Sequence, residues 1–380
     1  MRIVCISTSL VPDRTANSLQ LMKSCEALAA NGHELQLILP AFGPTLAWPA
    51  VAGHYGLTTE FAIRRLPVIR ALRRYDFALL SLLAARSWRP DLYYVWPLQV
   101  AGAASLLGRP TVLELHDQPQ GRLGPAWFRW FLLGAGARRI VITTQALQTH
   151  LQAQFDPARL AELALVAPNG VDIDRYRHLP APAEARRQLG LPESFTAVYT
   201  GHLYHGRGAE LMFALAQSRP DLSIVWAGGT EPAVAEWRQR VEQSRLSNLH
   251  VLGHIAHARV PLVQAAGDLL LMPYEDRIEV SGGGDSADFA SPMKAIEYLA
   301  AGRPILASDL PVLHEVLDED CARLLPPADL ERWRSAIDEL RQNPERRREL
   351  AAEAQSRAGQ YAWTRRAQRA VEGLAPAAAV

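Results

Sequence analysis

Short apolar runs alternate with longer helical stretches along most of this chain, and that alternation restricts the fold more than any other feature. A run suited to a buried strand covers residues 2–7, a helical pattern covers 18–31, and a second strand-like run covers 33–39. A strand, a helix and a strand in this order place the two strands parallel through a right-handed crossover. The sequence therefore predicts a parallel sheet with helices packed on its faces.

The alternation continues in two series, which are separated by the sequence Ala-Pro-Asn-Gly-Val-Asp at residues 167–172. Proline, asparagine and glycine together favour a turn that ends the first series. A chain of 380 residues is long enough to bury two cores. We therefore predict an α/β fold with two Rossmann-like parallel-sheet domains facing an interdomain cleft, at residues 1–168 and 169–360. A C-terminal helix and tail are expected at 361–380, with a crossing back to the first domain as one option.

Two segments interrupt the regular pattern. Residues 40–59 contain no Asp, Glu, Lys or Arg and several Gly and Pro, which predicts a long loop of the kind that is often functional. Residues 275–288 are acidic and rich in glycine, which predicts a flexible flap. Further strands are expected at 92–95, 111–115, 140–143, 163–166, 196–200, 223–227, 250–253, 269–273 and 305–307, and further helices at 69–85, 98–107, 145–154 and 183–189 and after 307.

Residues 291–304 predict one short helix with both ends marked. Ser291 is a favoured N-cap, and Pro292 suits the first helical position because an N–H there would have no helical partner. Gly302 suits the left-handed residue after the last turn, and Pro304 prevents the helix from continuing.

Lys294 is the unusual residue of this helix, because a cation in the first turn meets the partial positive charge of unpaired N–H groups. An anion bound at the helix start would reverse that effect, and phosphate is a frequent ligand there. Lys294 is one of only two lysines in the chain, the other being Lys23. Glu297 lies on the same edge of the helix, where its carboxylate can accept hydrogen bonds from sugar or ribose hydroxyls. An exposed Lys294–Glu297 ion pair is the alternative, and this segment alone leaves it open.

A second phosphate-facing turn is predicted where the strand at 196–200 runs through glycines and basic residues into a helix. Gly201 and His202 begin this turn, and Arg207 lies near its end. The spacing fits neither a P-loop nor G-x-G-x-x-G, and the loop after the first strand lacks that fingerprint too. The first sheet is therefore not expected to bind a dinucleotide in that way.

His116 and Asp117 directly follow the strand predicted at 111–115. Ligands of open α/β sheets bind beyond the carboxyl ends of the strands, so this position favours chemistry or substrate contact. The alternative is a histidine satisfied within a turn, with Asp117 capping the residues that follow.

Charge differs between the two halves of the chain. Residues 1–168 hold 16 Lys and Arg against 10 Asp and Glu, whereas the remainder holds 24 against 29. The basic half favours an anionic acceptor or a membrane surface, and its excess is too small to indicate nucleic acid. The aromatic residues at 127–133 suit an amphipathic helix in a membrane interface or, as we prefer, a helix packed on the sheet.

The cysteines Cys5, Cys25 and Cys321 have no paired spacing, which argues for a reducing compartment and against a disulfide framework or a zinc site. No signal-peptide pattern is visible, and the longest apolar run, at 77–85, is too short to span a bilayer. We therefore expect a cytoplasmic protein, with peripheral contact at the inner face of the membrane as an option.

Together these residues resemble the retaining glycosyltransferases of family 4, which have the two-domain GT-B fold. The resemblance extends over nearly the whole chain. Its most specific part is the pattern S-P-x-K-x-x-E-Y-x-A-x-G-x-P at 291–304, which is similar to one subgroup. Residues 169–172 are similar to the family's interdomain turn. Residues 201–208 resemble its G-R-L…K-G loop, with His202 in the place of Arg and Arg207 in the place of Lys, and both are expected to remain cationic donors to phosphate.

The resemblance implies an enzyme that moves a hexose, with retention, from a nucleotide-diphosphate sugar to a glycan, lipid-linked or small-molecule acceptor. It implies that domain closure excludes water and that no metal or other cofactor takes part. The aspartates of the D-x-D spacing at 172–174 are expected to be structural. His116 falls where the family has a histidine that contacts the donor sugar, and Asp117 is a further catalytic candidate. The residues implied to bind the donor are Gly201, His202, Arg207, Ser291, Pro292, Met293 and Lys294 around the pyrophosphate and Glu297 at the ribose.

One position departs from the family pattern. Many members have a second glutamate eight positions before Glu297, and here that position is Phe289. Asp288, Asp285 or Glu279 could take its place, as could backbone amides. Two alternatives to a transferase therefore stay open: a GT-B subunit without turnover, and a GT-B epimerase that converts a sugar nucleotide without an acceptor.

Overall fold

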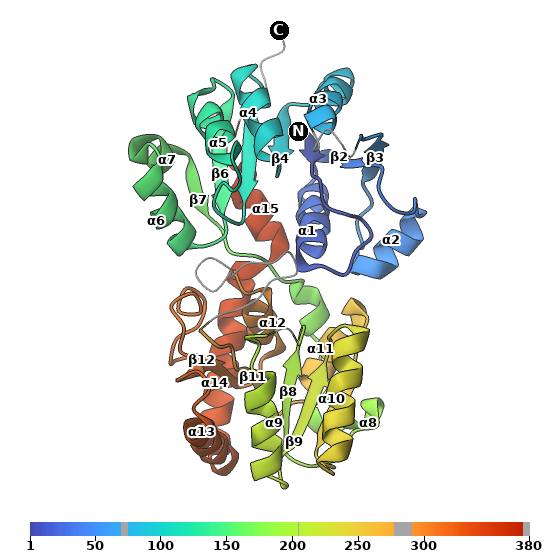
Figure 1. The fold of residues 1–380 in the computed structure, drawn as a ribbon, viewed down its shortest axis with the longest axis vertical. Coiled ribbons are helices and arrows are strands. Elements are labelled where there is room, and N and C mark those ends of the chain that lie inside the picture. The colour runs from blue at the N-terminus through green and yellow to red at the C-terminus, as the bar shows by residue number, and fades with distance from the viewer. Residues whose placement is uncertain (70–74, 204, 277–290, 375–380) are drawn as a thin grey trace. The chain divides into compact units, whose positions relative to one another are not determined.

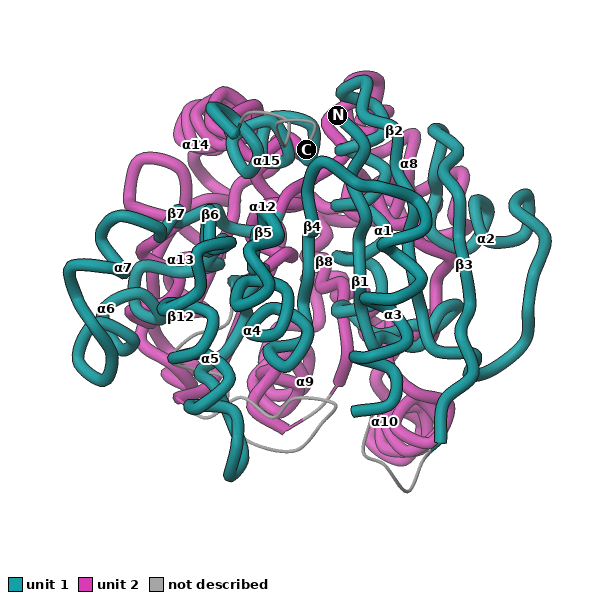
Figure 2. Tube along the Cα trace, turned by 90° about the horizontal axis from the view of Figure 1, so that it is seen from above, with its two compact units in different colours: residues 1–169, 289–291, 363–380 teal, residues 170–288, 292–362 magenta. Residues whose placement is uncertain are grey.

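A computed structural model of the chain describes residues 1–69, 75–203, 205–276 and 291–374 (Figure 1). These residues form two compact units, which Figure 2 colours separately. The first unit comprises residues 1–169 and 291 together with 363–374, and the second comprises 170–276 and 292–362, apart from the residues outside the described ranges. The chain therefore leaves the first unit near residue 169 and returns to it with its C-terminal helix.

The first unit is built on a seven-stranded parallel sheet with the strand order β3-β2-β1-β4-β5-β6-β7. The two halves of the sheet grow outward from β1, whose Ile3 pairs with Leu35 on one side and with Leu92 on the other. The strands are β1 (Arg2–Ile6), β2 (Glu34–Pro40), β3 (Ala62–Leu66), β4 (Leu92–Val95), β5 (Thr111–Leu115), β6 (Ala137–Ile142) and β7 (Ala164–Val166). The helices are α1 (Ala16–Ala30), α2 (Trp48–Tyr55), α3 (Tyr75–Trp88), α4 (Leu98–Leu106), α5 (Gly124–Leu133), α6 (Gln145–Gln154), α7 (Pro157–Leu163) and α15 (Trp363–Val371).

The second unit has a six-stranded parallel sheet with the order β10-β9-β8-β11-β12-β13. The strands are β8 (Thr196–Thr200), β9 (Ser223–Ala227), β10 (Leu249–Gly253), β11 (Leu269–Met272), β12 (Ile305–Ser308) and β13 (Ala322–Leu325). The helices are α8 (Pro182–Leu189), α9 (Ala209–Ser218), α10 (Glu231–Gln243), α11 (Val260–Ala265), α12 (Met293–Ala301), α13 (Leu330–Gln342) and α14 (Pro344–Ala358), with 3-10 turns η2 (Ile173–Tyr176), η3 (His257–Arg259) and η4 (Gly359–Tyr361). The prediction of two parallel-sheet α/β domains is confirmed.

One prediction for the first unit is wrong, and one strand was missed. Residues 40–59 are not one long loop, because they contain α2, which ends at Gly56 in the left-handed conformation. The strand β3 was not predicted, because it is an edge strand with a single buried residue, Leu66, and two arginines, Arg64 and Arg65, inside its short apolar run. Of the helix predicted at 69–85, residues 70–74 lie outside the described ranges, and α3 begins at Tyr75.

The aromatic helix α5 packs on the sheet, as preferred from the sequence. Phe128, Phe131 and Leu132 are buried in the core of the first unit, whereas Trp130 and Leu133 are exposed. No helix within the described residues is long and apolar enough to cross a membrane.

The C-terminal helix α15 packs against α1 in the first unit. Its Thr364 carbonyl accepts a hydrogen bond from the Asn31 side chain at 2.8 Å. Nearer the end of the helix, the carbonyls of Arg369 and Glu372 accept from Arg139. The last helix is therefore a structural part of the unit with which the chain begins.

Candidate functional site

The helix predicted around Lys294 is α12 (Met293–Ala301), and it begins one residue later than expected. Its N-cap is Pro292 rather than Ser291. The Ser291 hydroxyl instead accepts from the Asn169 backbone N–H at 3.0 Å, and the Ser291 carbonyl accepts from the Asn169 side chain at 3.1 Å. Within the described part of the chain, no side chain caps α12, so the N–H groups near Met293 stay available at the helix start. The predicted end is confirmed, since Gly302 has a φ of 59°.

Lys294 is partly buried against an aromatic ring. Its ammonium lies 3.7 Å from the centre of the Tyr199 ring, in β8, and 5.0 Å from that of Tyr274. Gly201 lies directly over it, because a Cβ at that position would be 2.5 Å from the ammonium nitrogen. The exposed Lys294–Glu297 ion pair is therefore excluded as the explanation of this residue.

The turn between β8 and α9 brings a second cation to the same place. The Arg207 guanidinium lies 4.6 Å from the Tyr274 ring, so both cations contact one aromatic side chain. Gly208 forms the N-cap of α9 with a φ of 76°, and a Cβ there would lie 1.9 Å from the carbonyl oxygen of Pro273. Two helix starts, at α9 and α12, thus carry one cation each.

The two cations repel one another, and burial adds to that effect. Burial and the neighbouring Arg207 charge hold the pKa of Lys294 well below its usual value, with Glu297 opposing. Burial, followed by the charges of Lys294 and Arg207, also lowers the pKa of His202. In the unliganded protein these surroundings therefore favour the neutral form of His202. An anion bound here would reverse both shifts.

Glu297 lies one helical turn after Lys294 and is partly buried. Its carboxylate accepts a hydrogen bond from the Gln264 side chain at 3.4 Å. Burial raises the pKa of Glu297 to about 7, although the Arg175 charge and the Gln264 hydrogen bond oppose this. Glu297 therefore changes its ionisation near neutral pH, and its ionised form is an acceptor for hydroxyl groups.

The two aspartates of the D-x-D spacing at residues 172–174 form ion pairs with arginines three residues further along the chain. Asp172 lies 3.6 Å from Arg175, and Asp174 lies 3.0 Å from Arg177, each within the turn that includes η2. Both carboxylates therefore support the turn that begins the second unit.

His116 and Asp117 follow β5 in the first unit, as predicted, but their surroundings differ. Asp117 is exposed, and its carboxylate accepts from the Gln118 N–H at 2.7 Å and from the Gln120 side chain. That arrangement matches the alternative in which Asp117 caps a turn. His116 is partly buried, and its Nε2 lies 2.8 Å from Oε1 of Glu114.

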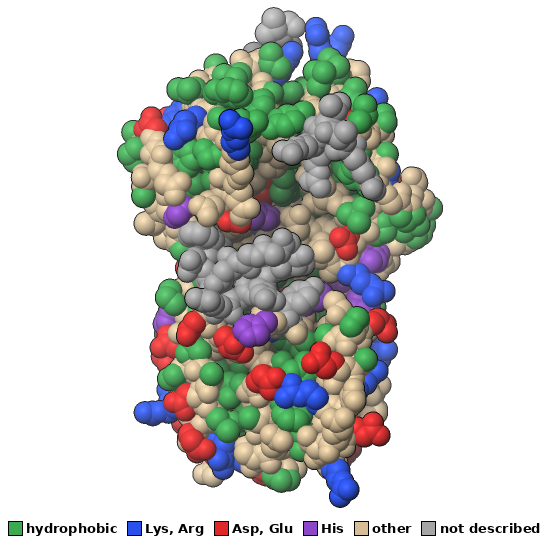
Figure 3. Space-filling model, in the orientation of Figure 1, with side chains coloured by type: hydrophobic (Ala, Val, Ile, Leu, Met, Phe, Trp, Pro, Cys, Tyr) green, Lys and Arg blue, Asp and Glu red, His purple; other side chains and the backbone are tan. Residues whose placement is uncertain are grey.

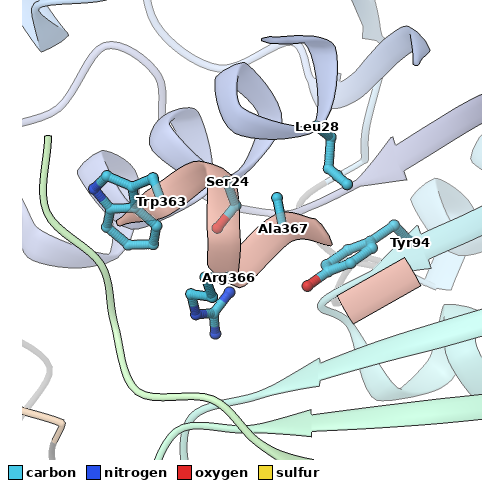
Figure 4. Close-up of a pocket in the computed structure, with 6 residues that line it drawn as sticks. All are labelled: Ser24, Leu28, Tyr94, Trp363, Arg366 and Ala367. Atoms are coloured by element: carbon cyan, nitrogen blue, oxygen red, sulfur yellow. The ribbon is translucent and has the colours of Figure 1, made fainter. Parts of the chain in front are cut away.

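Glu114 is the main residue that the sequence analysis missed. It is 1% exposed and forms an ion pair with Arg366 of α15. An acidic residue inside an apolar strand was the available signal, since such a residue is seldom buried without a partner. Near this pair, a small pocket in the first unit is lined by Ser24, Leu28, Tyr94, Trp363, Arg366 and Ala367 (Figure 4).

The sequence predicts that Asp288, Asp285 or Glu279 replaces the glutamate that is missing at Phe289. Phe289, Asp288, Asp285 and Glu279, and most of the segment 275–288, lie outside the described residues. The predicted donor-binding residues Gly201, His202, Arg207, Met293, Lys294 and Glu297 all belong to the second unit, whereas His116, Asp117 and Ser291 belong to the first.

Two glycosyltransferase family profiles match the chain. The profile described as Glycosyltransferase Family 4 matches residues 21–175, and the profile described as Glycosyl transferases group 1 matches residues 195–343. One match covers most of the first unit and the other most of the second.

Curated relatives are similar over part of their length. The chain is 24% identical over 201 residues to an alpha-galactosylglucosyldiacylglycerol synthase of Streptococcus pneumoniae, covering 51% of this chain and 50% of the relative. It is 25% identical over 250 residues to a D-inositol 3-phosphate glycosyltransferase of Corynebacterium urealyticum, covering 61% of this chain and 55% of the relative. The chain thus spans about half the length of the curated relatives it matches.

Among solved structures, HepE of Anabaena in complex with UDP-glucose is similar over 98% of this chain and 99% of its own, with 21% identity and a TM-score of 0.74. At that identity the similarity establishes the fold.

Proposed function

The chain belongs to the family 4 glycosyltransferases of the GT-B fold, and from this premise we propose that it transfers a hexose from a nucleotide-diphosphate sugar to an acceptor, with retention at the anomeric carbon. The two relatives described above are an alpha-galactosylglucosyldiacylglycerol synthase and a D-inositol 3-phosphate glycosyltransferase, which supports a reaction of this kind.

The observation that carries the proposal is the position of Lys294. A partly buried ammonium lies against the face of Tyr199, in the first turn of an uncapped helix, beside a second cation. Within the described residues, no carboxylate lies within 4 Å of the Lys294 ammonium to form an ion pair. A diphosphate supplies the negative charge that both the ammonium and the helix start favour.

Glu297 and His116 fit the remaining parts of such a donor. An ionised Glu297 can accept hydrogen bonds from both ribose hydroxyls, one turn along the helix from the cation that binds phosphate. His116, at the carboxyl end of β5, is proposed to contact the sugar. Since HepE was solved with UDP-glucose, a UDP-hexose is the first donor to test.

The chemistry follows from the charge that develops on the leaving group. When the glycosidic bond breaks, negative charge grows on the diphosphate, and cations held in advance beside helix N–H groups stabilise it. Lys294 and Arg207 are proposed to supply that stabilisation without a metal ion. Because the Lys294 ammonium and Tyr199 are already in contact, little reorganisation is needed when the donor binds.

The acceptor is proposed to be lipid-linked, with the first unit in peripheral contact with a membrane. Within the described residues, every large hydrophobic side chain classed as exposed belongs to the first unit. Figure 3 shows hydrophobic side chains gathered over the part of that unit that contains α3, α4 and α5. The set on these helices and their ends comprises Tyr75, Leu79, Leu80, Leu83, Leu106, Leu107, Leu123, Trp130 and Leu133.

Exposed arginines accompany this apolar surface. Arg86, Arg109, Arg122 and Arg129 lie on or beside the same helices and are exposed. Apolar side chains combined with arginines suit the interface of a bilayer that contains anionic lipids. The name of the pneumococcal relative, which includes diacylglycerol, supports an acceptor of this kind.

The test is calorimetric titration with UDP-, GDP-, ADP- and dTDP-sugars, followed by product analysis. We expect one sugar nucleotide to bind, and Lys294→Ala to weaken its binding at least about tenfold. Arg348→Ala is the matched control, because Arg348 is exposed on α14 of the same unit. Binding without transfer or hydrolysis would instead support a subunit without turnover, and an epimerised sugar would support an epimerase. Unchanged affinity in Lys294→Ala would refute the proposed site.

A further inference from the structure

Glu114 is a densely hydrogen-bonded carboxylate of the first unit. Its Oε1 accepts from Gln20 Nε2 at 3.0 Å, from His116 Nε2 at 2.8 Å and from Arg366 Nη2 at 2.5 Å. Its Oε2 accepts from the Tyr94 hydroxyl and from Arg366 Nη1 at 3.4 Å. The donors come from α1, β4, α15 and the end of β5, so four parts of the first unit meet at this carboxylate.

This environment keeps Glu114 ionised. Burial would raise its pKa, but the Arg366 charge, together with the hydrogen bond and charge of His116, lowers the pKa to about 2. An ionised carboxylate has no proton to donate. Every group that contacts it within hydrogen-bond distance must therefore be a donor, and for His116 the contacting atom is Nε2.

A proton on Nε2 determines what the other ring nitrogen can do. In the neutral imidazole only one nitrogen carries a proton, so Nδ1 must then be an acceptor. We propose that Glu114 and Arg366 are positioning residues that fix His116 in the Nε2-protonated tautomer and leave Nδ1 to accept a hydrogen bond from a hydroxyl of the donor sugar. The tautomer rests on the contact between Nε2 and the ionised Glu114 carboxylate, and only its use toward the sugar rests on the proposed function.

Arg366 is fixed independently of Glu114. Its guanidinium also donates to the carbonyls of Ala167, at 3.2 Å and 3.3 Å, and of Pro168, at 2.8 Å. The side chain is 4% exposed and lines the pocket between α1 and α15, where Figure 4 shows it with Tyr94. The C-terminal helix thus contributes a rigid cation behind the histidine, and this cation is 252 residues from Glu114 in sequence.

The tautomer can be read directly from long-range ¹H–¹⁵N correlation spectra of histidine-labelled full-length protein at pH 8.5. The His116 signals are assigned as those absent from the His116→Gln spectrum. We expect a protonated Nε2 and an unprotonated Nδ1 in the wild type. A proton on Nδ1 alone, or on both nitrogens, would overturn the proposal, and this measurement needs no donor and no variant that disturbs the core.

The role of Arg366 is tested in the same spectra. In Arg366→Met the buried carboxyl loses its main cation and takes up a proton, so His116 should shift at least partly to the Nδ1-protonated form. Arg369→Met is the control, because Arg369 is exposed on the same helix and donates to the Val166 carbonyl instead. Arg366→Lys should keep the wild-type tautomer. An unchanged tautomer in folded Arg366→Met would contradict the role assigned to Arg366.

Steady-state kinetics, with the donor that the calorimetric titration identifies, separates a positioning role of Arg366 from a general contribution to the stability of the fold. We expect Arg366→Met to lower kcat about tenfold with the donor KM nearly unchanged, and Arg366→Lys to recover most of the loss. Equal kcat in the wild type and Arg366→Met would overturn the use of Nδ1 toward the sugar. If no sugar nucleotide is turned over by the wild type, the proposed function fails, and the spectra still decide the tautomer.

Discussion

The ammonium of Lys294 lies 3.7 Å from the centre of the Tyr199 ring, in a space that exists because residue 201 is glycine. The start of α12 and the end of β8 therefore lie closer together than a side chain on residue 201 would allow. Among the residues that the structure describes, the cation contacts aromatic rings rather than a carboxylate, which leaves its charge available to an anionic ligand.

The first prediction concerns Gly201→Ala. Its Cβ would lie 2.5 Å from the Lys294 ammonium nitrogen, and its φ of 146° is unfavourable for alanine. We expect a stability loss of about 1–3 kcal/mol and a weaker affinity for the donor, measured by thermal unfolding and calorimetry. Gly190→Ala is the control, because its φ of 66° is also positive but a Cβ there meets nothing within 4 Å. Equal donor affinity in Gly201→Ala and the wild type would contradict the role of this contact.

The second prediction concerns the pH dependence of donor binding through Glu297. Its pKa, which burial raises to about 7, means that it is mostly protonated at pH 6 and mostly ionised at pH 8. Because ribose hydroxyls donate to the ionised form, affinity for the donor should rise by up to about tenfold over this range. Calorimetry with UDP-glucose checks this without interference from a titrating terminal phosphate.

Glu297→Gln should remove this pH dependence and bind with the lower affinity at every pH. The effect on folding has the opposite sign. A raised pKa means that the folded protein binds the proton more tightly than the unfolded chain, so this stabilising contribution is full below about pH 4 and is lost as the pH rises through 7. Parallel pH profiles for the wild type and Glu297→Gln would show that the ribose contact is wrongly assigned.

The third prediction concerns Arg366 and acid stability. Since the pKa of Glu114 is lowered to about 2, its ionised form stabilises the folded state above the unfolded value of about 4, and this contribution is lost as the pH falls toward 2. Arg366→Met should cost about 3–5 kcal/mol at neutral pH, because Glu114 loses its cation and is neutralised only by taking up a proton from a neutral solution.

The measurement is urea unfolding at pH 7, 5 and 3 for Arg366→Met and the Arg369→Met control. The variant should lose less stability between pH 5 and pH 3 than the wild type does, because its folded Glu114 already holds a proton at pH 5 and only the unfolded chain takes one up as the pH falls. If the free energy of unfolding of Arg366→Met falls with pH as steeply as that of the wild type, another cation must stabilise the ionised form of Glu114.

The fourth prediction concerns the apolar surface of the first unit. Leu79 and Leu83 are 62% and 56% exposed on α3, and Leu133 at the end of α5 is 78% exposed. The combined change of these three to serine should lower co-sedimentation with vesicles that contain anionic lipid by about tenfold or more, because each buried side chain contributes about 1.5–3 kcal/mol. Leu46→Ser is the control, since Leu46 is exposed before α2 rather than on α3, α4 or α5.

Binding to anionic vesicles should also weaken as salt rises, because exposed arginines accompany the leucines. Equal sedimentation of the wild type, the triple variant and the control would argue against a membrane role for this surface. Binding to neutral and anionic vesicles alike would argue against the contribution of the arginines.

The sequence by itself determined the two parallel sheets, most strand positions and the end of α12 at Gly302. These features depend on local periodicity and on the conformational limits of glycine and proline, which neighbouring residues reveal. It also singled out Lys294, because the partial positive charge at the start of a helix disfavours a cation in the first turn.

Only the tertiary structure decided the partners. The Ser291 hydroxyl contacts Asn169 instead of capping its own helix, Tyr199 faces Lys294, and Glu114 meets Arg366 from the far end of the chain. Each of these contacts joins residues distant in sequence, and a short-range pattern contains no information about which distant group removes water from a side chain or neutralises its charge.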